Sequence, residues 1–318
     1  MAVIINQVHN YKNIHGNSAT WRYTLRQCTT CGLGFISPKP TFEVLQTFYD
    51  LDYGCYAVTM NLGREANSLK YKLAKLRYAS IFRSNLRNGT AATLGSVAEW
   101  LTGKVLSYTI GLPLNLACDA RILEVGYGSG SWLLIMEKLG YSNLHGYDID
   151  ANSENRNRLT ANGIKVQCGD LLQVAYPDDY FDCIRLEHSF EHLLNPGSIL
   201  NELYRILKPG GHLVMNFPSI NASSFNLSPL HYAHRDSPRH LYLHTRLSAS
   251  NMLRAANFTV RGIREYGVAL VLGATINNSL KARGFAVGLK GFSVFSPIYH
   301  LIEFFARRGE AITLWASK

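Results

Sequence analysis

Three glycines and the acidic residues that follow them are the part of the sequence with the clearest chemical meaning. The run Arg121-Ile-Leu-Glu-Val-Gly-Tyr-Gly-Ser-Gly130 places apolar residues before Gly126, Gly128 and Gly130. Such an apolar run is typical of a buried parallel strand, and glycines after it allow a tight turn and a close approach of a ligand. Amides that open the next helix can point at a polar ligand. The run therefore predicts a strand, a ligand-binding turn and a helix.

The spacing of these residues indicates the kind of ligand. The pattern is E-x-G-x-G-x-G, which differs from the G-x-G-x-x-G of a dinucleotide site. Asp148 lies 22 positions after Gly126, at the end of the next predicted strand. A carboxylate there can hold the ribose hydroxyls of a nucleotide. Its other role would be a helix N-cap, for which Asp150 is better placed, so a ribose contact at Asp148 is the favoured interpretation.

Strands and helices alternate through the rest of the chain. Helices are predicted at 132–139, 151–162, 198–207 and 245–256, and strands at 143–147, 164–167, 181–186, 212–216, 258–263 and 311–316. This alternation predicts a parallel sheet with right-handed crossovers, in which ligands bind at the carboxyl ends of the strands. We therefore expect Gly126, Asp148, Asp170 and Glu187 to converge on one crevice.

Six motifs stand in order between Ile122 and Pro218. They are the glycine run, Gly146-Tyr-Asp148, Gly169-Asp-Leu171, Phe181-Asp, His188-Ser-Phe-Glu-His192 and Leu207-Lys-Pro-Gly-Gly211. In this order and spacing they resemble the core of a class I S-adenosylmethionine-dependent methyltransferase. The resemblance implies an α/β fold with a Rossmann-like, seven-stranded, mostly parallel sheet flanked by helices. It also implies S-adenosyl-L-methionine as the cofactor.

The same resemblance assigns eleven residues to the cofactor. They are Glu124, Leu186 and Glu187 at the methionine end, Gly126, Tyr127, Gly128 and Gly130 around the methionine part, Asp148 at the ribose, and Ile149, Asp170 and Leu171 at the adenine. Tyr127 departs from the family pattern, in which a smaller residue is common.

Composition limits the class of protein. The 318 residues are 47% hydrophobic, which is enough for a large core and one or two domains. The start lacks the charged segment and cleavage pattern of a signal peptide, and the six cysteines form no disulfide-like framework. No apolar stretch has the roughly 18 to 20 residues of a membrane span. We expect a cytoplasmic protein, with a peripheral position at the inner face of the membrane left open.

The net charge of +10 suggests an anionic partner. Part of it is concentrated between Arg64 and Arg87, where a basic amphipathic helix is predicted. Two interpretations stay open for that helix: a solvated face, or attraction of a phosphorylated substrate or an anionic bilayer.

Residues 1–117 are expected to form an N-terminal extension before a methyltransferase domain at 118–318. The head resembles that of methyltransferases acting on sugars and small metabolites, where a zinc ribbon often precedes the core. Only the pair Cys28 and Cys31 is present, Cys55 is alone, and His9 and His15 are poorly spaced as substitutes. A structural zinc needs four ligands, so a degenerate ribbon without metal is expected. Residues 60–118 are expected to be a helical cap.

An apolar insertion is expected near 268–305, within the methyltransferase domain. It is either a helical cover over the substrate cavity or a shallow membrane-docking surface for a lipid-linked substrate. The choice between the two stays open.

Histidines supply the candidate catalytic groups. His188-Ser-Phe-Glu-His192 matches the inverted zinc-protease pattern H-x-x-E-H, but it directly follows a parallel strand, so the protease interpretation is rejected. His231, His234, His240 and His244 match no strong metal-ligand spacing, and no metal site is expected. His188 and His240 are the candidate general bases, because histidine titrates near neutral pH.

The leading functional hypothesis is methyl transfer to a small molecule such as a sugar, a lipid-linked glycan or another metabolite. The acceptor is expected to be anionic or lipid-linked, and peripheral membrane contact would suit it. RNA methylation is an alternative that the charge allows, although Leu186-Glu-His188 replaces the motif usual in base amino-methyltransferases. A non-catalytic cofactor-binding or partner protein is the third hypothesis.

Overall fold

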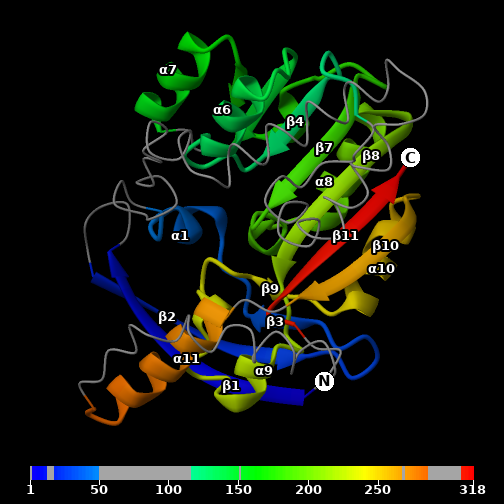
Figure 1. The fold of residues 1–318 in the computed structure, drawn as a ribbon. Helices are drawn as coiled ribbons and strands as arrows, with labels where there is room; N and C mark the ends of the chain where they lie inside the picture. The colour runs from blue at the N-terminus through cyan, green and yellow to red at the C-terminus, as the bar shows by residue number, and fades with distance from the viewer. Residues whose placement is uncertain (1, 13–17, 50–115, 150–151, 267–268, 286–308) are drawn as a thin grey trace. The chain divides into compact units, whose positions relative to one another are not determined.

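The computed structural model describes residues 2–12, 18–49, 116–149, 152–266, 269–285 and 309–318 (Figure 1). The chain divides into two compact units. The central unit comprises 51–185 and 206–214, and the terminal unit comprises 1–50, 186–205 and 215–318.

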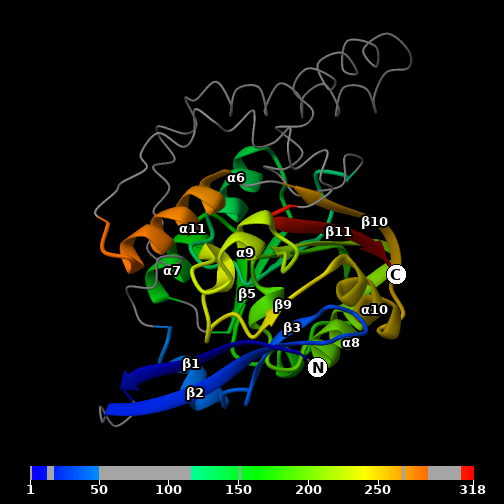
Figure 2. The ribbon, with the colours of Figure 1, turned by 90° about the horizontal axis from the view of Figure 1, so that it is seen from below.

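A seven-stranded sheet confirms the expected fold. Its strands are β4 (Ile122–Val125), β5 (Leu144–Asp148), β6 (Lys165–Cys168), β7 (Phe181–Glu187), β8 (Leu207–Pro218), β10 (Thr259–Tyr266) and β11 (Ala311–Ser317). Their order is β10-β11-β8-β7-β4-β5-β6. β5 pairs in parallel with β4 and β6, whereas β10 and β11 pair antiparallel and lie side by side in Figures 1 and 2. The order reverses at β4, which is where parallel α/β sheets bind ligands.

The central unit follows the predicted elements closely. All four residues of β4 are buried, as the apolar run requires. Helices α6 (Ser131–Lys138) and α7 (Ser153–Ala161) follow β4 and β5. The N-cap of α7 is Asn152 and not Asp150, because the Asn152 side chain accepts hydrogen bonds from the amides of Glu154 and Asn155. The short helix η1 (Leu171–Gln173) follows β6.

The N-terminal residues of the terminal unit form a second sheet. Strands β1 (Ala2–Lys12), β2 (Ser18–Gln27), β3 (Gly34–Ser37) and β9 (Tyr242–Leu243) are hydrogen-bonded in the order β1-β2-β3-β9. Figure 2 shows β1 and β2 as a long antiparallel pair. Helix α1 (Phe42–Gln46) is the one helix among residues 2–49 that the structure describes. The helical cap expected at 60–118 and the basic segment at 64–87 lie almost wholly outside the described residues.

This second sheet joins the N-terminal residues to residues beyond the expected boundary at 117. A boundary at 117 would separate residues 34–37 from everything C-terminal to them, whereas β3 pairs with β9 through Gly34–Leu243 and Phe35–Tyr242. Buried Tyr23, Leu25 and Ile36 pack in one core with residues such as Leu241. The first fifty residues therefore belong to the same compact unit as the C-terminal region.

The remaining elements of the terminal unit are helices. They are η2 (Phe190–His192), α8 (Pro196–Ile206), α9 (Ser223–Leu227), η3 (Ala233–Arg235), α10 (Arg246–Ala255) and α11 (Ala269–Ala282). Thr245 and Ser248 form a capping box at the start of α10. α11 occupies the first part of the expected insertion, and residues 286–308 lie outside the described part. None of the described helices has the length and apolar character needed to cross a membrane.

Candidate functional site

The glycine turn after β4 has the backbone conformation that its sequence predicts. Gly126, Gly128 and Gly130 have φ angles of 77°, 53° and 69°, in the left-handed region that favours glycine. Gly130 is also required by packing, because a Cβ there would lie 2.6 Å from Cδ1 of Leu159 on α7. Packing against Leu159 of α7 therefore requires glycine at position 130.

Asp148 is joined directly to this turn. Its Oδ2 accepts a hydrogen bond from the amide of Gly128 at 2.9 Å, and the residue is 7% exposed. The amide of Gly126 donates to the carbonyl of Tyr147 at 2.7 Å. The carboxylate expected at the ribose and the turn expected at the methionine part thus form one hydrogen-bonded group.

Two residues of α7 hold the turn through its carbonyl groups. The sequence analysis did not single them out. Asn155 donates through Nδ2 to the carbonyl of Gly128 at 3.3 Å, and Arg158 donates to the carbonyl of Ser129. Arg158 also donates to Asn155 Oδ1 at 3.1 Å. Polar residues one helical turn apart are common on exposed helix faces, so sequence alone gave no signal for this role.

The residues expected at the adenine differ in how far they are exposed. Ile149 is 51% exposed, so its apolar surface is available for contact with a ligand. Asp170 accepts from the amide of Leu172 at 3.1 Å and caps η1. Leu171 is buried in the core at 1% exposure, whereas its neighbour Leu172 is 48% exposed. Leu172 is thus the better placed of the two leucines for ligand contact, because only exposed apolar surface can be covered by a ligand.

Glu124 at the methionine end forms a buried ion pair. Its Oε1 contacts Nη1 of Arg185 on β7, and the Arg185 guanidinium lies 4.4 Å from the centre of the Trp132 ring. A charged residue between the apolar residues Ile184 and Leu186 was the available sequence signal for Arg185, and it was missed. Glu124 therefore has a protein partner that neutralises its charge.

Tyr127 points into the protein. It is 5% exposed, and a Cβ on Gly146 would lie 2.9 Å from its ring. Burial raises the pKa of the Tyr127 hydroxyl, and the nearby Asp148 carboxylate adds to the effect. The large residue is accommodated because Gly146 on β5 leaves room for its ring.

Leu186 and Glu187 belong to the terminal unit. Leu186 is fully buried, so its side chain is part of the core. Glu187 Oε1 accepts a hydrogen bond from Asn216 Nδ2 at 2.8 Å, and the same amide group lies 2.6 Å from the Tyr266 hydroxyl. Asn216, at the end of β8, is another residue that the sequence analysis missed.

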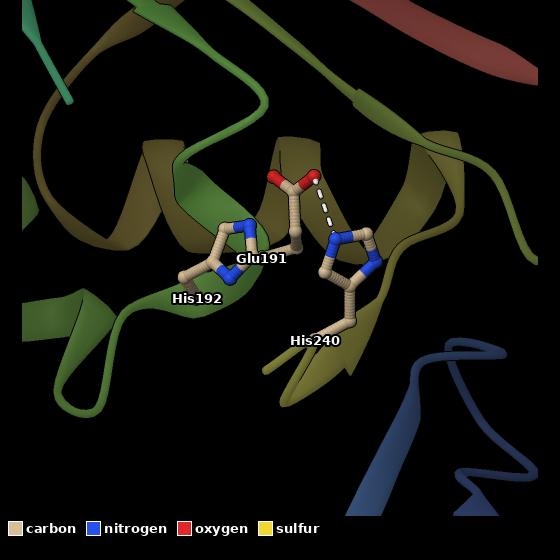
Figure 3. A group of neighbouring side chains, drawn as sticks. All are labelled: Glu191, His192 and His240. Atoms are coloured by element: carbon tan, nitrogen blue, oxygen red, sulfur yellow. Dashed lines mark ion pairs between the residues drawn. The ribbon is translucent and has the colours of Figure 1, made fainter. Parts of the chain in front are cut away.

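Both candidate bases, His188 and His240, approach Glu191. His188 Nδ1 lies 3.4 Å and His240 Nε2 3.8 Å from Glu191 Oε1. Glu191 is fully buried in η2 (Figure 3). His188 has a left-handed φ of 48°, which is uncommon for a residue other than glycine, and its amide donates to the carbonyl of Asn216.

The two histidines differ in their environments. Burial lowers the pKa of His240 to about 3, and the neighbouring His192 adds to the effect. A base with such a low pKa accepts a proton poorly at neutral pH. The His188 side chain is 39% exposed, so it is the better candidate for contact with an acceptor.

The cysteine pair lies in the turn between β2 and β3. Both side chains are half-buried, and no disulfide joins them. In the described part of the chain, no group of three potential metal ligands includes either cysteine. Cys55 lies outside the described residues, and so do the side chains of His9 and His15, so the metal-free ribbon stays a prediction.

Comparison with known families decides the class. The sequence model of a family described as "Methyltransferase domain" matches residues 97–262, just over half of the chain. The chain belongs to this methyltransferase domain family. The expected resemblance of the core to a methyltransferase domain is therefore confirmed, and S-adenosyl-L-methionine is the cofactor that such a domain implies, whereas the degenerate zinc-ribbon head stays a prediction.

Curated relatives match the methyltransferase domain over about a third of the chain. Demethylmenaquinone methyltransferase of Thermus thermophilus is 31% identical over 113 residues, which are 34% of this chain and 51% of that protein. Sterol 24-C-methyltransferase erg-4 of Neurospora crassa is 30% identical over 104 residues, which are 31% of this chain and 27% of that protein. The chain thus spans between about a quarter and a half of the length of these relatives.

A solved structure with a similar arrangement is the S-adenosylmethionine-dependent methyltransferase from Mesorhizobium loti. It has a TM-score of 0.43 and 16% sequence identity, over 69% of this chain and 97% of that one.

The central unit of the methyltransferase domain carries residues that fit the cofactor. Three left-handed glycines stand next to a carboxylate that is hydrogen-bonded to the turn, and exposed Ile149 follows that carboxylate in sequence. Such a turn lets a ligand approach the backbone closely because no Cβ is in the way, while the apolar side chain can cover a flat ring. The carboxylate and the shape of the backbone thus fit the expected cofactor.

Proposed function

We propose that this protein transfers a methyl group from S-adenosyl-L-methionine to a small-molecule acceptor, of the sugar, lipid-linked glycan or other metabolite class. The observation that supports the proposal most directly is the Asp148–Gly128 hydrogen bond, which joins the carboxylate at the end of β5 to the glycine turn. Bound S-adenosylmethionine would supply an electrophilic methyl group on a positively charged sulfur.

The protein's own contribution is to bind the cofactor and the acceptor, to orient them and to exclude water. A cationic leaving group needs little acid catalysis, so alignment of the acceptor with the methyl group is the main requirement. In this proposal the glycine turn holds the methionine part, Asp148 the ribose, and Ile149 and Leu172 the adenine. Asn155 and Arg158 keep the turn in place through its carbonyls.

We propose that His188 takes up the proton that the acceptor loses. Its side chain is partly exposed, and Glu191 lies 3.4 Å from its Nδ1, where a carboxylate can orient the ring. His240 is less suited as a base because burial holds its pKa at about 3. A His188→Asn variant should retain cofactor binding and lose turnover, if the acceptor is deprotonated during the reaction.

The names of two relatives support a small acceptor. One is named for demethylmenaquinone and the other for a sterol, and neither name refers to a nucleic acid. We propose that the acceptor is likewise a small molecule, of an anionic or lipid-linked kind in keeping with the net charge of +10.

Calorimetric titration with S-adenosylhomocysteine tests the cofactor half of the proposal. We expect micromolar affinity, which Asp148→Asn weakens and Glu154→Gln, an exposed change on α7, leaves unchanged. Transfer of a labelled methyl group to nucleotide sugars, lipid-linked glycans and quinones then tests the acceptor half. A folded protein without affinity for S-adenosylhomocysteine would refute the proposal.

A further inference from the structure

We propose that Glu191, His192 and His240 form a binding site for one divalent transition-metal ion. One ligand atom from each of the three residues lies within 4.8 Å of the others. Figure 3 shows that a ring nitrogen of each histidine faces the Glu191 carboxylate, from η2 on one side and from the segment before β9 on the other.

The tautomer of His240 supports a ligand role. Its Nδ1 lies 2.6 Å from the backbone carbonyl of His234, and a carbonyl can only accept a hydrogen bond. Nδ1 therefore carries the proton, and Nε2 of the neutral ring presents a lone pair. This lone pair faces the Glu191 Oε1 at 3.8 Å. Two electron-rich atoms placed face to face in the interior are stabilised by a cation between them.

His192, like His240, has a backbone carbonyl next to its Nδ1. Its Nδ1 lies 3.1 Å from the carbonyl of Arg239 and 2.8 Å from the Tyr49 hydroxyl. A protonated Nδ1 suits both partners, since a hydroxyl can accept as well as donate, whereas a lone pair would face the carbonyl unfavourably. Nε2 is then the free donor atom. Histidine ligands of metals usually donate their other ring N–H to a carbonyl or carboxylate in this way.

Glu191 supplies the charge that such a site needs. The residue is fully buried, and neither carboxylate oxygen has a hydrogen-bond partner among the residues that the structure describes. A buried carboxylate is unfavourable unless nearby positive charge or hydrogen bonds compensate it. His188 Nδ1 at 3.4 Å and His240 Nε2 at 3.8 Å are the nearest side-chain atoms that can offset its charge, and a divalent ion bound to Glu191, His192 and His240 would offset it more fully.

The segment that carries His240 is fixed by its own contacts. Arg239 pairs with Asp236 at 2.6 Å and donates to the carbonyl of Phe48 at 2.9 Å. These contacts position the Arg239 carbonyl, which in turn holds His192. The ligands are therefore oriented by a second layer of interactions, as in established metal sites.

The donor set indicates the class of metal. Two imidazole nitrogens and one carboxylate oxygen suit zinc, iron(II) or cobalt(II), whereas magnesium and calcium prefer oxygen ligands alone. Three protein ligands leave coordination positions open, and an ion with an open position can bind and polarise an oxygen of a ligand. Such a role toward the acceptor rests on the proposed function, but metal binding itself does not.

Metal content is the direct test. The purified full chain would be stripped with a chelator and titrated with Zn²⁺ against a chromophoric competitor, and separately with Co²⁺, whose visible absorption reports its ligands. The same titrations are made in a Cys28→Ser/Cys31→Ser background, which removes the Cys-x-x-Cys pair as an alternative zinc site. We expect one equivalent of Zn²⁺ in both proteins, with a cobalt spectrum typical of nitrogen and oxygen ligands.

Matched variants locate the ion. Glu191→Gln and His240→Ala should each weaken Zn²⁺ binding by at least about tenfold, within the range seen for loss of metal-site groups. Glu202→Gln, on α8, and His212→Ala, on β8, are the controls and should bind as the unchanged protein does. Folding is verified by circular dichroism, and affinity for S-adenosylhomocysteine is measured on the same samples.

Three results would overturn the site. They are the absence of stoichiometric Zn²⁺ or Co²⁺ binding by the folded chain, binding that disappears in the cysteine background, and binding that persists in folded Glu191→Gln. Because S-adenosylhomocysteine affinity is measured separately, loss of the metal site and loss of the proposed cofactor binding give different results.

Discussion

The carboxylate of Asp148 accepts a hydrogen bond from the amide of Gly128 at 2.9 Å, although the two residues come from different strand ends. Strands β4 and β5 pair in parallel, so their carboxyl ends lie together and the turn after one meets the last residue of the other. The methyltransferase domain thereby fixes a carboxylate against the backbone of the glycine turn.

Replacement of Asp148 by Asn tests its ribose contact. We expect S-adenosylhomocysteine to bind at least about tenfold more weakly, a loss of about 1.4 kcal/mol, because a carboxylate accepts hydroxyl hydrogen bonds more strongly than an amide. Calorimetry with an analogue that lacks the ribose 2′-hydroxyl separates this contact from the structural bond to Gly128. If the unchanged protein and the variant discriminate equally against the analogue, the ribose assignment is wrong.

Gly130 should tolerate alanine poorly. Its φ of 69° costs an L-residue about 1–2 kcal/mol, and the new Cβ would also meet Leu159. Gly163→Ala is the matched control, because it has a φ of 76° but no atom within 4 Å of the added Cβ. Urea unfolding should therefore show a larger loss of unfolding free energy at Gly130. Equal losses would mean that the contact with Leu159 relaxes without cost.

Arg185 should be more important for stability than its place in a strand suggests. Arg185→Met leaves the buried Glu124 without its counter-charge, which typically costs about 3–5 kcal/mol. The double variant Glu124→Gln/Arg185→Met should lose less, since the remaining group is neutral. Chemical denaturation of the two single variants and the double variant gives the coupling. Additive effects would show that the pair contributes little.

Asp182 should make stability depend on pH in the acid range. Burial raises the pKa of this carboxyl, but hydrogen bonds from Lys208 and from the Arg121 amide outweigh it and leave the pKa below its usual value. A lowered pKa in the folded state stabilises the protein above the unfolded pKa of about 3.9, and this stability is lost as the pH falls further.

The measurement is the free energy of unfolding of the unchanged protein and of Asp182→Asn between neutral pH and about pH 3. We expect the unchanged protein to be more stable at neutral pH by about 1 kcal/mol or less, because both side chains are partly exposed. The difference should shrink on acidification. A difference that grows as the pH falls would contradict the assignment.

Local patterns predicted the elements of the methyltransferase domain well. The predicted strand 181–186 is Phe181–Glu187 in the structure, and the predicted helix 245–256 is Arg246–Ala255. These signals are short apolar runs, caps and glycines, each of which acts within a few residues. The glycine turn, and the position of Asp148 at the end of a strand, were predicted from the same kind of local signal.

What the sequence analysis missed depends on pairing across long distances. Arg185 is explained by Glu124, and Asn216 by Glu187 and Tyr266, in each case from another strand. The motif His188-Ser-Phe-Glu-His192 was rejected as a protease site, and η2 is indeed too short to place both histidines on one helix face. Its Glu191 and His192 nonetheless meet His240, which no spacing rule connects to them.

The pairing of β3 with β9 has a consequence for how the protein is made. Gly34 and Leu243 are hydrogen-bonded neighbours although more than two hundred residues separate them. During synthesis the first three strands emerge long before their partner, so their edge must wait unpaired until the ribosome has produced β9. Closure of so large a loop is slow, and an exposed strand edge is open to pairing with other chains. Yield of soluble protein should therefore be sensitive to translation rate and to chaperones that shield nascent chains.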